Sequence, residues 1–327
     1  MKKECKILSI IIPAYNSQDY LKRCINSIPL EVFNDIDIIV VNDGSKDNTL
    51  AVAKTLKKEH PKTIQIINKK NGGHGSTINE AIKIAKGKYI RVLDSDDWLN
   101  YDLVQEYIKK LKYANEDLIL TNYSYNYIKE NKKELVNVFE AYKKIKIISD
   151  ILDKNISEND FVSFLSIHSC TIKTEKFKKI LKGGLLEKTF YEDQEYIARI
   201  ILATETVKVL DLDLYQYMIG RNEQSMAPIK LFQRRKDHEK VIRRLVSIYE
   251  ECEDDKKREI LSRRIREIFK THYWIYFYHS GLTRAERYEF KELKAKLAQR
   301  LPDISKNITW QFKMRLLIGR LKNTMLK

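Results

Sequence analysis

The sequence is poor in cysteine, and its cysteines form no pattern. Only four occur among 327 residues, at Cys5, Cys24, Cys170 and Cys252, with no CxxC pair and no histidine pattern beside them. Zinc sites and disulfide frameworks need such spacing. The cysteine usage therefore argues against both and fits a reducing compartment.

Long apolar runs are also missing. No run approaches the roughly 20 apolar residues that a membrane-spanning helix needs. The apolar stretch at 7–12 is too short for the core of a signal sequence, and a Pro-Ala-Tyr-Asn turn follows it. We therefore expect a cytoplasmic protein that at most lies on the inner face of the plasma membrane.

Two familiar phosphate-binding signatures are absent. The glycine-rich loop at 69–75 (KKNGGHG) is not GxGxxG, it follows the third strand rather than the first, and no Gly-Lys-Ser/Thr comes after it. A dinucleotide-binding fold and a Walker A loop are thus poor matches. The glycines would still let a ligand approach the backbone, with the N–H groups of the following helix free for an anion. The alternative is a plain flexible turn in which His74 only makes loop hydrogen bonds.

What the sequence has in excess is positive charge. Lys and Arg number 61 against 45 Asp and Glu, a net charge of +16, and 43% of the residues are hydrophobic, enough for a real core. The charge favours an anionic partner, whether nucleotide, nucleic acid or acidic membrane, and does not choose among them. The length predicts one large domain and a smaller one.

Buried strands alternate with helical segments in the first hundred residues. Apolar strands are predicted at 7–12, 36–41, 63–68 and 89–93, which indicates βαβ units and a mostly parallel sheet. Polar residues follow every strand, at 13–16, 42–45, 71–75 and 94–97. Because ligands bind beyond the carboxyl ends of parallel strands, we expect these four segments to share one crevice.

The acidic segment at 94–97 (DSDD) is the most informative of the four. Three carboxylates in four positions repel one another unless a cation lies among them, and hard oxygen ligands suit Mg²⁺ or Mn²⁺. The alternative is an acidic turn that caps the next helix through Asp97 or Asn100.

The pattern changes in the second half of the chain. Further strands are predicted at 118–127, 135–139, 163–172 and 207–217, and charged helices follow from residue 229. We place a domain boundary near Pro228, between a catalytic domain at 1–227 and a basic α-helical domain at 228–327. The segment 308–327 has one apolar face with Trp310 and one basic face. It could lie on an anionic membrane surface, or pack on the catalytic domain or a partner subunit.

Six motifs occur in one order: SIIIPAYN, VVNDGSKDNT, NGGHGSTINEAIKIAKGKYI, RVLDSDDW, YEDQEY and GRNEQSM. In this order they resemble the family 2 nucleotide-sugar glycosyltransferases of the GT-A fold. The resemblance covers roughly residues 7–226 and none of the remainder. It implies an α/β, Rossmann-like mixed sheet, mostly parallel and flanked by helices, followed here by a C-terminal helical region.

The resemblance also implies roles for individual residues. The donor nucleotide sugar would be bound by a set drawn from all the motifs: Pro13, Ala14, Tyr15, Asn16, Asp43, Asn71, Gly73, Asn79, Asp94, Ser95, Asp96, Arg221 and Ser225. Within this set, Asp94 and Asp96 match the DxD pair that holds Mn²⁺ or Mg²⁺ on the diphosphate. Asp193 matches the catalytic base, with Glu192 near the acceptor. For Asp193 alone, the alternative is an N-cap of the helix that follows.

One position departs from the family pattern. Many relatives carry Arg just before the Asn at position 79, whereas this chain has Ile78. A cationic contact to the nucleotide must then come from Arg91, Arg221 or His74, or be absent, and the base preference of the site depends on which of these holds.

The sequence thus predicts an inverting glycosyltransferase that moves a sugar from a nucleoside-diphosphate sugar, with a UDP-sugar as the expected donor, to a hydroxyl of a growing cell-surface glycan or glycolipid. Its partners would be the nucleotide-sugar donor and a glycan or lipid-linked acceptor, with membrane contact through 308–327, no nucleic acid, and an oligomeric state left open. Two alternatives remain: a nucleotidyltransferase, and a non-catalytic basic module that binds polyanions.

Overall fold

The computed structural model describes residues 6–153, 157–181, 183–220, 228–278, 282–301, 303–306, 308–310 and 312–314. The chain divides into two compact units. One comprises residues 1–156 and 163–222, and the other comprises residues 157–162 and 223–327. Arg221, Ser225 and residues 315–327 lie outside the described residues.

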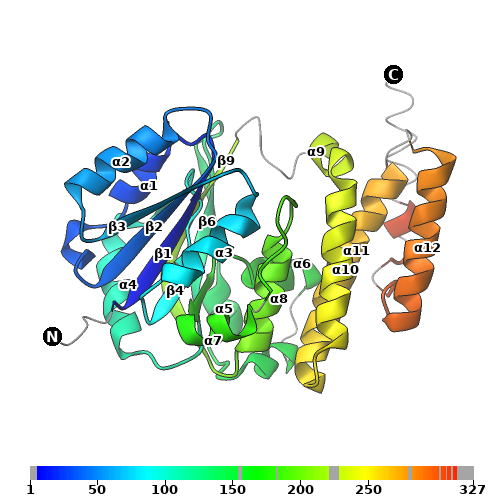
Figure 1. Cartoon of the computed structure of the whole chain (residues 1–327). Coiled ribbons are helices and arrows are strands. Elements are labelled where there is room, and N and C mark those ends of the chain that lie inside the picture. Colours follow the sequence, from blue (N-terminus) through cyan, green and yellow to red (C-terminus); the bar gives the residue numbers. More distant parts are fainter. Residues whose placement is uncertain are drawn as a thin grey trace. The chain divides into compact units, whose positions relative to one another are not determined.

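The first unit is built on one mixed sheet of nine strands with the order β3-β2-β1-β4-β8-β6-β9-β5, and β7 pairs with β6 (Figure 1). Its parallel half contains β1 (Leu8–Ala14), β2 (Ile36–Asp43), β3 (Ile64–Lys69) and β4 (Tyr89–Val92). The apolar side chains of β1, β2 and β4 are fully buried, which explains why these strands read as continuous apolar runs.

The second half of the sheet is mixed. The short strand β8 (Cys170–Lys173) is antiparallel to both β4 and β6 (Leu118–Tyr127). The long strand β9 (Val207–Ile219) then runs parallel to β6. Two antiparallel edge strands complete the sheet, β5 (Trp98–Leu99) on β9 and β7 (Lys132–Val136) on β6. Because β4, β6 and β9 share one direction, their carboxyl ends lie at the same edge of the sheet.

Helices flank this sheet. They are α1 (Leu21–Asn26), α2 (Thr49–Glu59), α3 (His74–Ile84), α4 (Tyr101–Tyr113), α5 (Val138–Tyr142), α7 (Thr174–Ile180) and α8 (Asp193–Ala203), with 3₁₀ turns at Leu30–Val32 and Ile148–Asp153. The predicted fold class, a mostly parallel mixed sheet flanked by helices and followed by a helical region, is confirmed.

Two predicted strands are wrong in their bounds. The strand expected at 135–139 lies at Lys132–Val136, because Asn137 accepts a hydrogen bond from the Glu140 N–H at 2.9 Å and starts α5. The strand expected at 163–172 is shorter, because α6 (Glu158–Phe164) occupies its beginning and Ser169 closes a turn through its hydroxyl bond to the Phe164 carbonyl at 2.7 Å.

The second unit is helical, with α6, α9 (Pro228–Gln233), α10 (Arg235–Glu250), α11 (Asp255–Tyr278) and α12 (Arg284–Arg300). A capping box at Thr283 and Glu286 begins α12. Tyr276 and Phe290 stack in its core with ring centroids 4.6 Å apart. None of the described helices combines the length and the apolar character that crossing a bilayer requires. Trp310, which lies in the predicted amphipathic segment 308–327, is 73% exposed.

Candidate active site

A pocket of 180 Å³ lies at the carboxyl ends of β1, β2 and β4 and at the start of α3. It is lined by residues from three predicted segments and from the glycine-rich loop: Pro13, Ala14, Tyr15, Ser17, Asp43, His74, Thr77, Asp94, Ser95 and Asp96. The predicted convergence of the strand-end segments is therefore found in the structure.

The segment after β1 forms one wall of this pocket. Pro13 and Ala14 are buried at the end of the strand, whereas Tyr15 is 47% exposed. Asn16 has a left-handed backbone with φ +49°. Its side-chain oxygen accepts a hydrogen bond from the Lys46 N–H at 2.9 Å, and its own N–H donates to Ser45 Oγ at 3.1 Å. Asn16 thus ties the turn after β1 to the turn after β2.

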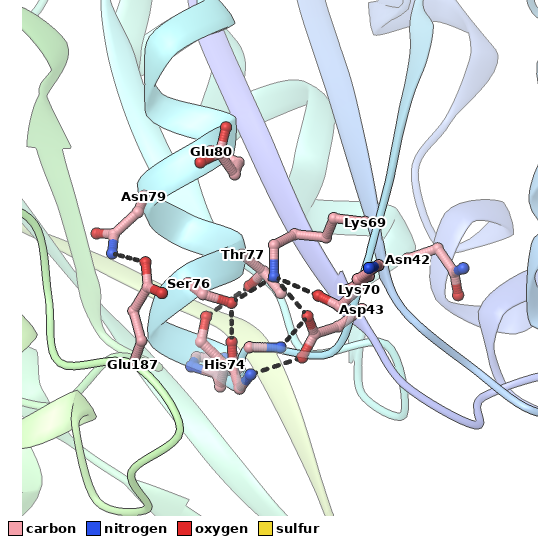
Figure 2. Close-up of polar contacts among 12 residues, drawn as sticks. Asn42, Asp43, Lys69, Lys70, His74, Ser76, Thr77, Asn79, Glu80 and Glu187 are labelled. Carbon is pink, nitrogen blue, oxygen red and sulfur yellow. Dashed lines mark hydrogen bonds and ion pairs between the residues drawn. The ribbon is translucent and has the colours of Figure 1, made fainter.

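Asp43 shapes the glycine-rich loop (Figure 2). Its Oδ1 accepts hydrogen bonds from the Gly72 N–H at 2.9 Å and from Lys69 Nζ at 2.8 Å, and its Oδ2 accepts one from the Gly73 N–H at 2.8 Å. Gly73 has φ +84°, a conformation that favours glycine. The buried carboxylate of Asp43 is thus an anchor of the loop, and its contact with a base or ribose stays a prediction.

Lys69 extends this network to α3. Its ammonium group also donates to Ser76 Oγ at 2.8 Å and to the Lys70 carbonyl at 2.9 Å (Figure 2). Asn71 is exposed, and its backbone packs so closely on Gly44 that a Cβ there would lie 2.7 Å from the Asn71 nitrogen. The loop between β3 and α3 is therefore a built structure and not a flexible turn.

His74, the first residue of α3, connects two acidic segments. Its Nε2 lies 2.9 Å from Asp94 Oδ1, and its Nδ1 lies 2.6 Å from Glu192 Oε1. Burial acts to lower the pKa of His74, but the hydrogen bonds and charges of Asp94 and Glu192 outweigh it and raise that pKa well above its usual value. Burial likewise acts to raise the pKa of Asp94, and His74 more than offsets this, so that the pKa is lowered. The arrangement is an imidazolium between two carboxylates.

The acidic turn presents its side chains in different directions. Ser95 Oγ lies 2.7 Å from Ser17 Oγ, and Asp94 and Asp96 line the pocket. Asp97 is fully buried and instead accepts from the Tyr215 hydroxyl at 2.6 Å and from the Met218 N–H at 2.7 Å. Burial first, then the charges of its acidic neighbours, raises the pKa of Asp97 well above its usual value. Asp97 is thus not an N-cap but a tie between the turn and β9.

Three side chains lie close enough together to form a candidate site for a divalent cation. One ligand atom each from Asp94, Asp97 and His168 lies within 4.8 Å of the others. Burial lowers the pKa of His168 to about 4, so its imidazole is neutral and able to coordinate. Carboxylate oxygens with one neutral imidazole fit Mn²⁺ or Mg²⁺. We call Asp94, Asp97 and His168 the cation group. It shares Asp94 with the predicted DxD pair, whereas Asp96 lines the same pocket but is not a member of the cation group.

Arg91 is not available to a nucleotide, contrary to one suggestion from the sequence. Its side chain is fully buried, donates to Thr171 Oγ1 at 2.9 Å and to Thr121 Oγ1 at 3.3 Å, and also hydrogen-bonds the His168 carbonyl. Arg91 therefore supports the backbone of His168 from inside the sheet.

Asn79 lies away from the pocket. Its amide pairs with the Leu185 backbone at 2.8 and 3.1 Å and donates to Glu187 Oε1 at 3.2 Å, as Figure 2 shows for the last contact. It lines a separate hollow with Glu187 and Gly184. Asn79 thus holds the segment that precedes Glu192 against α3, and it is not among the residues that line the pocket at the strand ends.

The acidic pair at the start of α8 follows a strained residue. Tyr191 has φ +67°, which is uncommon for a residue with a side chain. Glu192 is 5% exposed and reaches His74, whereas Asp193 is half-buried and begins α8. Gln194 Nε2 donates to Asp193 Oδ2 at 3.0 Å. The N-cap residue of α8 is Glu192, so Asp193 is a first-turn residue rather than the cap.

Sequence reasoning missed His168 and Tyr215. His168 lies in a segment predicted as strand, and Tyr215 lies in a strand expected only to build the sheet. A lone histidine among serines and a tyrosine in an alternating strand carry no recognisable signal. Their roles appear only once β8 and β9 are placed beside β4.

Comparison with known proteins identifies the family to which the chain belongs. The model of glycosyl transferase family 2 matches residues 9–181, more than half of the 327 residues. Glycosyltransferase GlyA of Streptococcus pneumoniae is 28% identical over 67% of this chain and 31% of its own length. Chondroitin synthase of Pasteurella multocida is 43% identical over 32% of this chain and 11% of its own length. The chain thus spans less than a third of these two relatives.

Solved structures show the same fold. Residues 1–349 of TarS from Staphylococcus aureus, solved in complex with UDP-GlcNAc, superpose with a TM-score of 0.67 at 19% identity, covering 91% of this chain and 82% of that chain. The mannosyltransferase PcManGT from Pyrobaculum calidifontis, solved with GDP-Man and Mn²⁺, gives 0.53 at 13% identity, covering 96% of this chain and 86% of that chain.

Proposed function

The chain belongs to glycosyl transferase family 2 and is a glycosyltransferase that acts on nucleotide sugars, and from this premise we propose an inverting transfer from a nucleoside diphosphate sugar to an acceptor hydroxyl. The non-catalytic polyanion-binding alternative is thereby wrong. No observation on the described residues favours a nucleotidyltransferase.

The proposal depends most on the bridge that His74 makes between Asp94 and Glu192. The donor would lie in the pocket lined by Tyr15, Asp43 and the acidic turn. Glu192 directly precedes Asp193, so the bridge brings the start of α8 to the border of the donor pocket. A sugar bound there would have the diphosphate side at the acidic turn and the acceptor side toward α8.

Asp193 would act as the base in this arrangement. The attacking hydroxyl must lose a proton as its oxygen bonds to the anomeric carbon, and a positioned carboxylate contributes about 10²–10⁴ in rate to such a step. The Gln194 amide donates to Asp193 Oδ2 at 3.0 Å and so orients the carboxylate that would take this proton. Attack opposite to the leaving diphosphate gives inversion at the anomeric carbon.

A divalent ion bound by Asp94, Asp97 or His168, with Asp96 beside it, would neutralise charge on the diphosphate oxygens. The chain's own contribution there is to hold these ligands. His74 keeps Asp94 ionised, and Tyr215 with the Met218 N–H fixes Asp97. The solved complex of PcManGT with GDP-Man and Mn²⁺ supports a metal in this fold.

The donor we propose is a UDP-sugar, supported by the complex of TarS with UDP-GlcNAc. For the acceptor we propose a growing cell-surface glycan or glycolipid, supported by the match to chondroitin synthase. We also propose that the enzyme acts at the inner face of the plasma membrane and contacts that membrane through residues 308–327.

The test is a panel of nucleotide sugars, UDP-Glc, UDP-Gal, UDP-GlcNAc, UDP-GalNAc and GDP-Man, each with and without Mn²⁺. We expect one UDP-sugar to raise the melting temperature only with Mn²⁺ and to release UDP slowly, because a ligand that binds the native state stabilises it. A panel in which no nucleotide sugar shifts the melting temperature would overturn the proposal.

A further inference from the structure

Aromatic rings line one face of the sheet from the acidic turn outward. Along β6, Tyr123, Tyr125 and Tyr127 alternate onto the same face, and β9 places Tyr215 and Tyr217 beside the first two. The other face of β6 is polar, since Asn122 and Ser124 bond aspartates of β9 there. The aromatic face is thus set by the strand period and the pairing register.

This row of rings is continuous with the carboxylates. His168, which shares the cation group with Asp94, stacks on Tyr217 with ring centroids 4.5 Å apart and an interplanar angle of 28°. The ring centroids of Tyr217 and Tyr125 lie 5.7 Å apart, and those of Tyr125 and Tyr127 lie 6.4 Å apart. Burial, followed by the charges of the acidic turn, raises the pKa of Tyr217, as expected for a ring near those carboxylates.

The exposure of the rings rises along the row. Tyr123 and Tyr215 are each 1% exposed and belong to the core, whereas Tyr125, Tyr127 and Tyr217 are half-buried. The three outer rings are thus only partly covered by the protein. We name the three half-buried residues, Tyr125, Tyr127 and Tyr217, the tyrosine track.

We propose that the tyrosine track is the subsite that binds the acceptor glycan next to the sugar that receives the transfer, by stacking pyranose rings on tyrosine faces. A pyranose has an apolar face of C–H groups and an edge of hydroxyls. The negative face of an aromatic ring attracts such C–H groups. The inference rests on the proposed function and adds the class and the place of the acceptor.

The surroundings of the track match the hydroxyl edge of a sugar. The Tyr127 hydroxyl donates to Glu134 Oε2 at 2.9 Å, and Lys132 lies 5.7 Å from the centre of the Tyr127 ring. Both charged residues belong to β7, at the outer end of the track. Aromatic faces with a few polar groups at their border are the usual lining of a small-molecule site. A lipid surface would instead be expected to meet an apolar border.

The experiment uses the full chain and saturation-transfer NMR with cellobiose, lactose and chitobiose as probes, in the presence of UDP and Mn²⁺. We expect saturation to be transferred from the protein to the pyranose ring protons of at least one disaccharide. Tyr217→Leu and Tyr125→Leu keep apolar volume but remove the aromatic face, and each should weaken that binding about tenfold. Tyr113→Leu, at the exposed end of α4, is the matched control and should bind as the unaltered chain does.

Two readings separate this inference from the proposed function. The melting-temperature shift by the UDP-sugar tests the donor site and the fold. Tyr125→Leu, whose ring contacts Tyr217 and is one ring farther from His168, should keep that shift. Two results would overturn the tyrosine track alone. In both, the donor still binds; in the first the leucine variants bind disaccharide as the unaltered chain does, and in the second the unaltered chain binds none of the three disaccharides. A nucleotide-sugar panel without any shift overturns the proposed function itself.

Discussion

Nδ1 of His74 lies 2.6 Å from Oε1 of Glu192, and this contact joins the loop after β3 to the start of α8 across 118 residues of chain. The opposite ring nitrogen reaches Asp94 of the acidic turn at 2.9 Å. One imidazolium thus holds a carboxylate of the pocket at the strand ends and a carboxylate beside Asp193. Without it the two carboxylates would face each other with no cation between them.

Replacing His74 by Ala should therefore lower kcat/KM about 10- to 150-fold, because a hydrogen bond to a charged partner contributes roughly 1.5–3 kcal/mol. The loss should appear in kcat as well as in the KM for the donor, since both carboxylates lose their position. Steady-state kinetics with the UDP-sugar measure it. His60→Ala, at the end of α2 against Phe33, is the control and should keep its activity. Equal kinetics for both variants would remove His74 from the site.

Asp193→Asn should reduce transfer by about 10²–10⁴ while the melting-temperature shift by the donor stays unchanged. The amide keeps the contact with Gln194 but cannot take the proton. Glu175→Gln is a matched control, because Glu175 is also acidic and in the first turn of a helix, α7, but fully away from the pocket lining. Turnover by Asp193→Asn at the level of this control would assign the base elsewhere.

Asp43 and Lys69 should behave as one unit. Asp43→Asn and Lys69→Met each break the network that shapes the glycine-rich loop, and each should weaken donor binding by about 1–3 kcal/mol. A double-mutant cycle measured by calorimetry with UDP should show strong coupling, with the double variant little worse than either single one. Additive losses would instead indicate that Asp43 contacts the nucleotide directly.

The cation group predicts a metal dependence that the DxD pattern alone does not. His168→Ala should raise the Mn²⁺ concentration needed for half-maximal activity about 10- to 100-fold, as should Asp94→Asn, because each removes a ligand atom from the group. Asp96→Ala should weaken donor binding in Mn²⁺. Titration of Mn²⁺ into chelator-treated protein provides the measurement. If His168→Ala keeps the normal Mn²⁺ requirement, the imidazole is not a ligand.

The helical unit should lose stability in acid. His238 on α10 and His272 on α11 stack with centroids 5.2 Å apart, and burial lowers the pKa of His238 to about 4 and that of His272 well below its usual value. Within the described structure neither ring nitrogen of His272 has a hydrogen-bond partner. Lys236 and Arg243 add repulsion against a charged ring.

Because the folded pKa lies below the unfolded value of about 6.5, the unfolded chain binds more protons, and stability that is complete above that pH is lost as the pH falls toward 4. We expect a loss of about 1–2 kcal/mol for each histidine between pH 7 and pH 5. His272→Phe should reduce this loss of unfolding free energy at acid pH, as measured by urea unfolding at a series of pH values. His60→Phe is the control and should lose as much unfolding free energy at acid pH as the unaltered chain does.

The parallel half of the fold could be predicted from the sequence, because each strand there is a continuous apolar run that ends in polar residues. β1, β2 and β4 bury both faces, so burial and sequence pattern agree along their whole length. The mixed half was less predictable. β8 has only four residues, and its place between β4 and β6 depends on pairing partners far along the chain.

The candidate site divides in the same way. Tyr15, Asp43, Asp94 and Asp96 come from strand ends, and their convergence follows from the direction of the strands. The cation group, the bridge of His74 and the burial of Arg91 depend on which side chains meet across non-neighbouring strands. Short motifs do not record such contacts, so the sequence alone predicts neither the tie of Asp97 to β9 nor the place of His168.

The tie between Asp97 and the end of β9 has a consequence for synthesis of the chain. Met218, whose N–H bonds Asp97, follows it by 121 residues. A nascent chain that stops at residue 181, where the family match ends, lacks both donors that β9 supplies to the Asp97 carboxyl. The acidic turn can therefore take its final form only after the ribosome has delivered the last strand of the sheet.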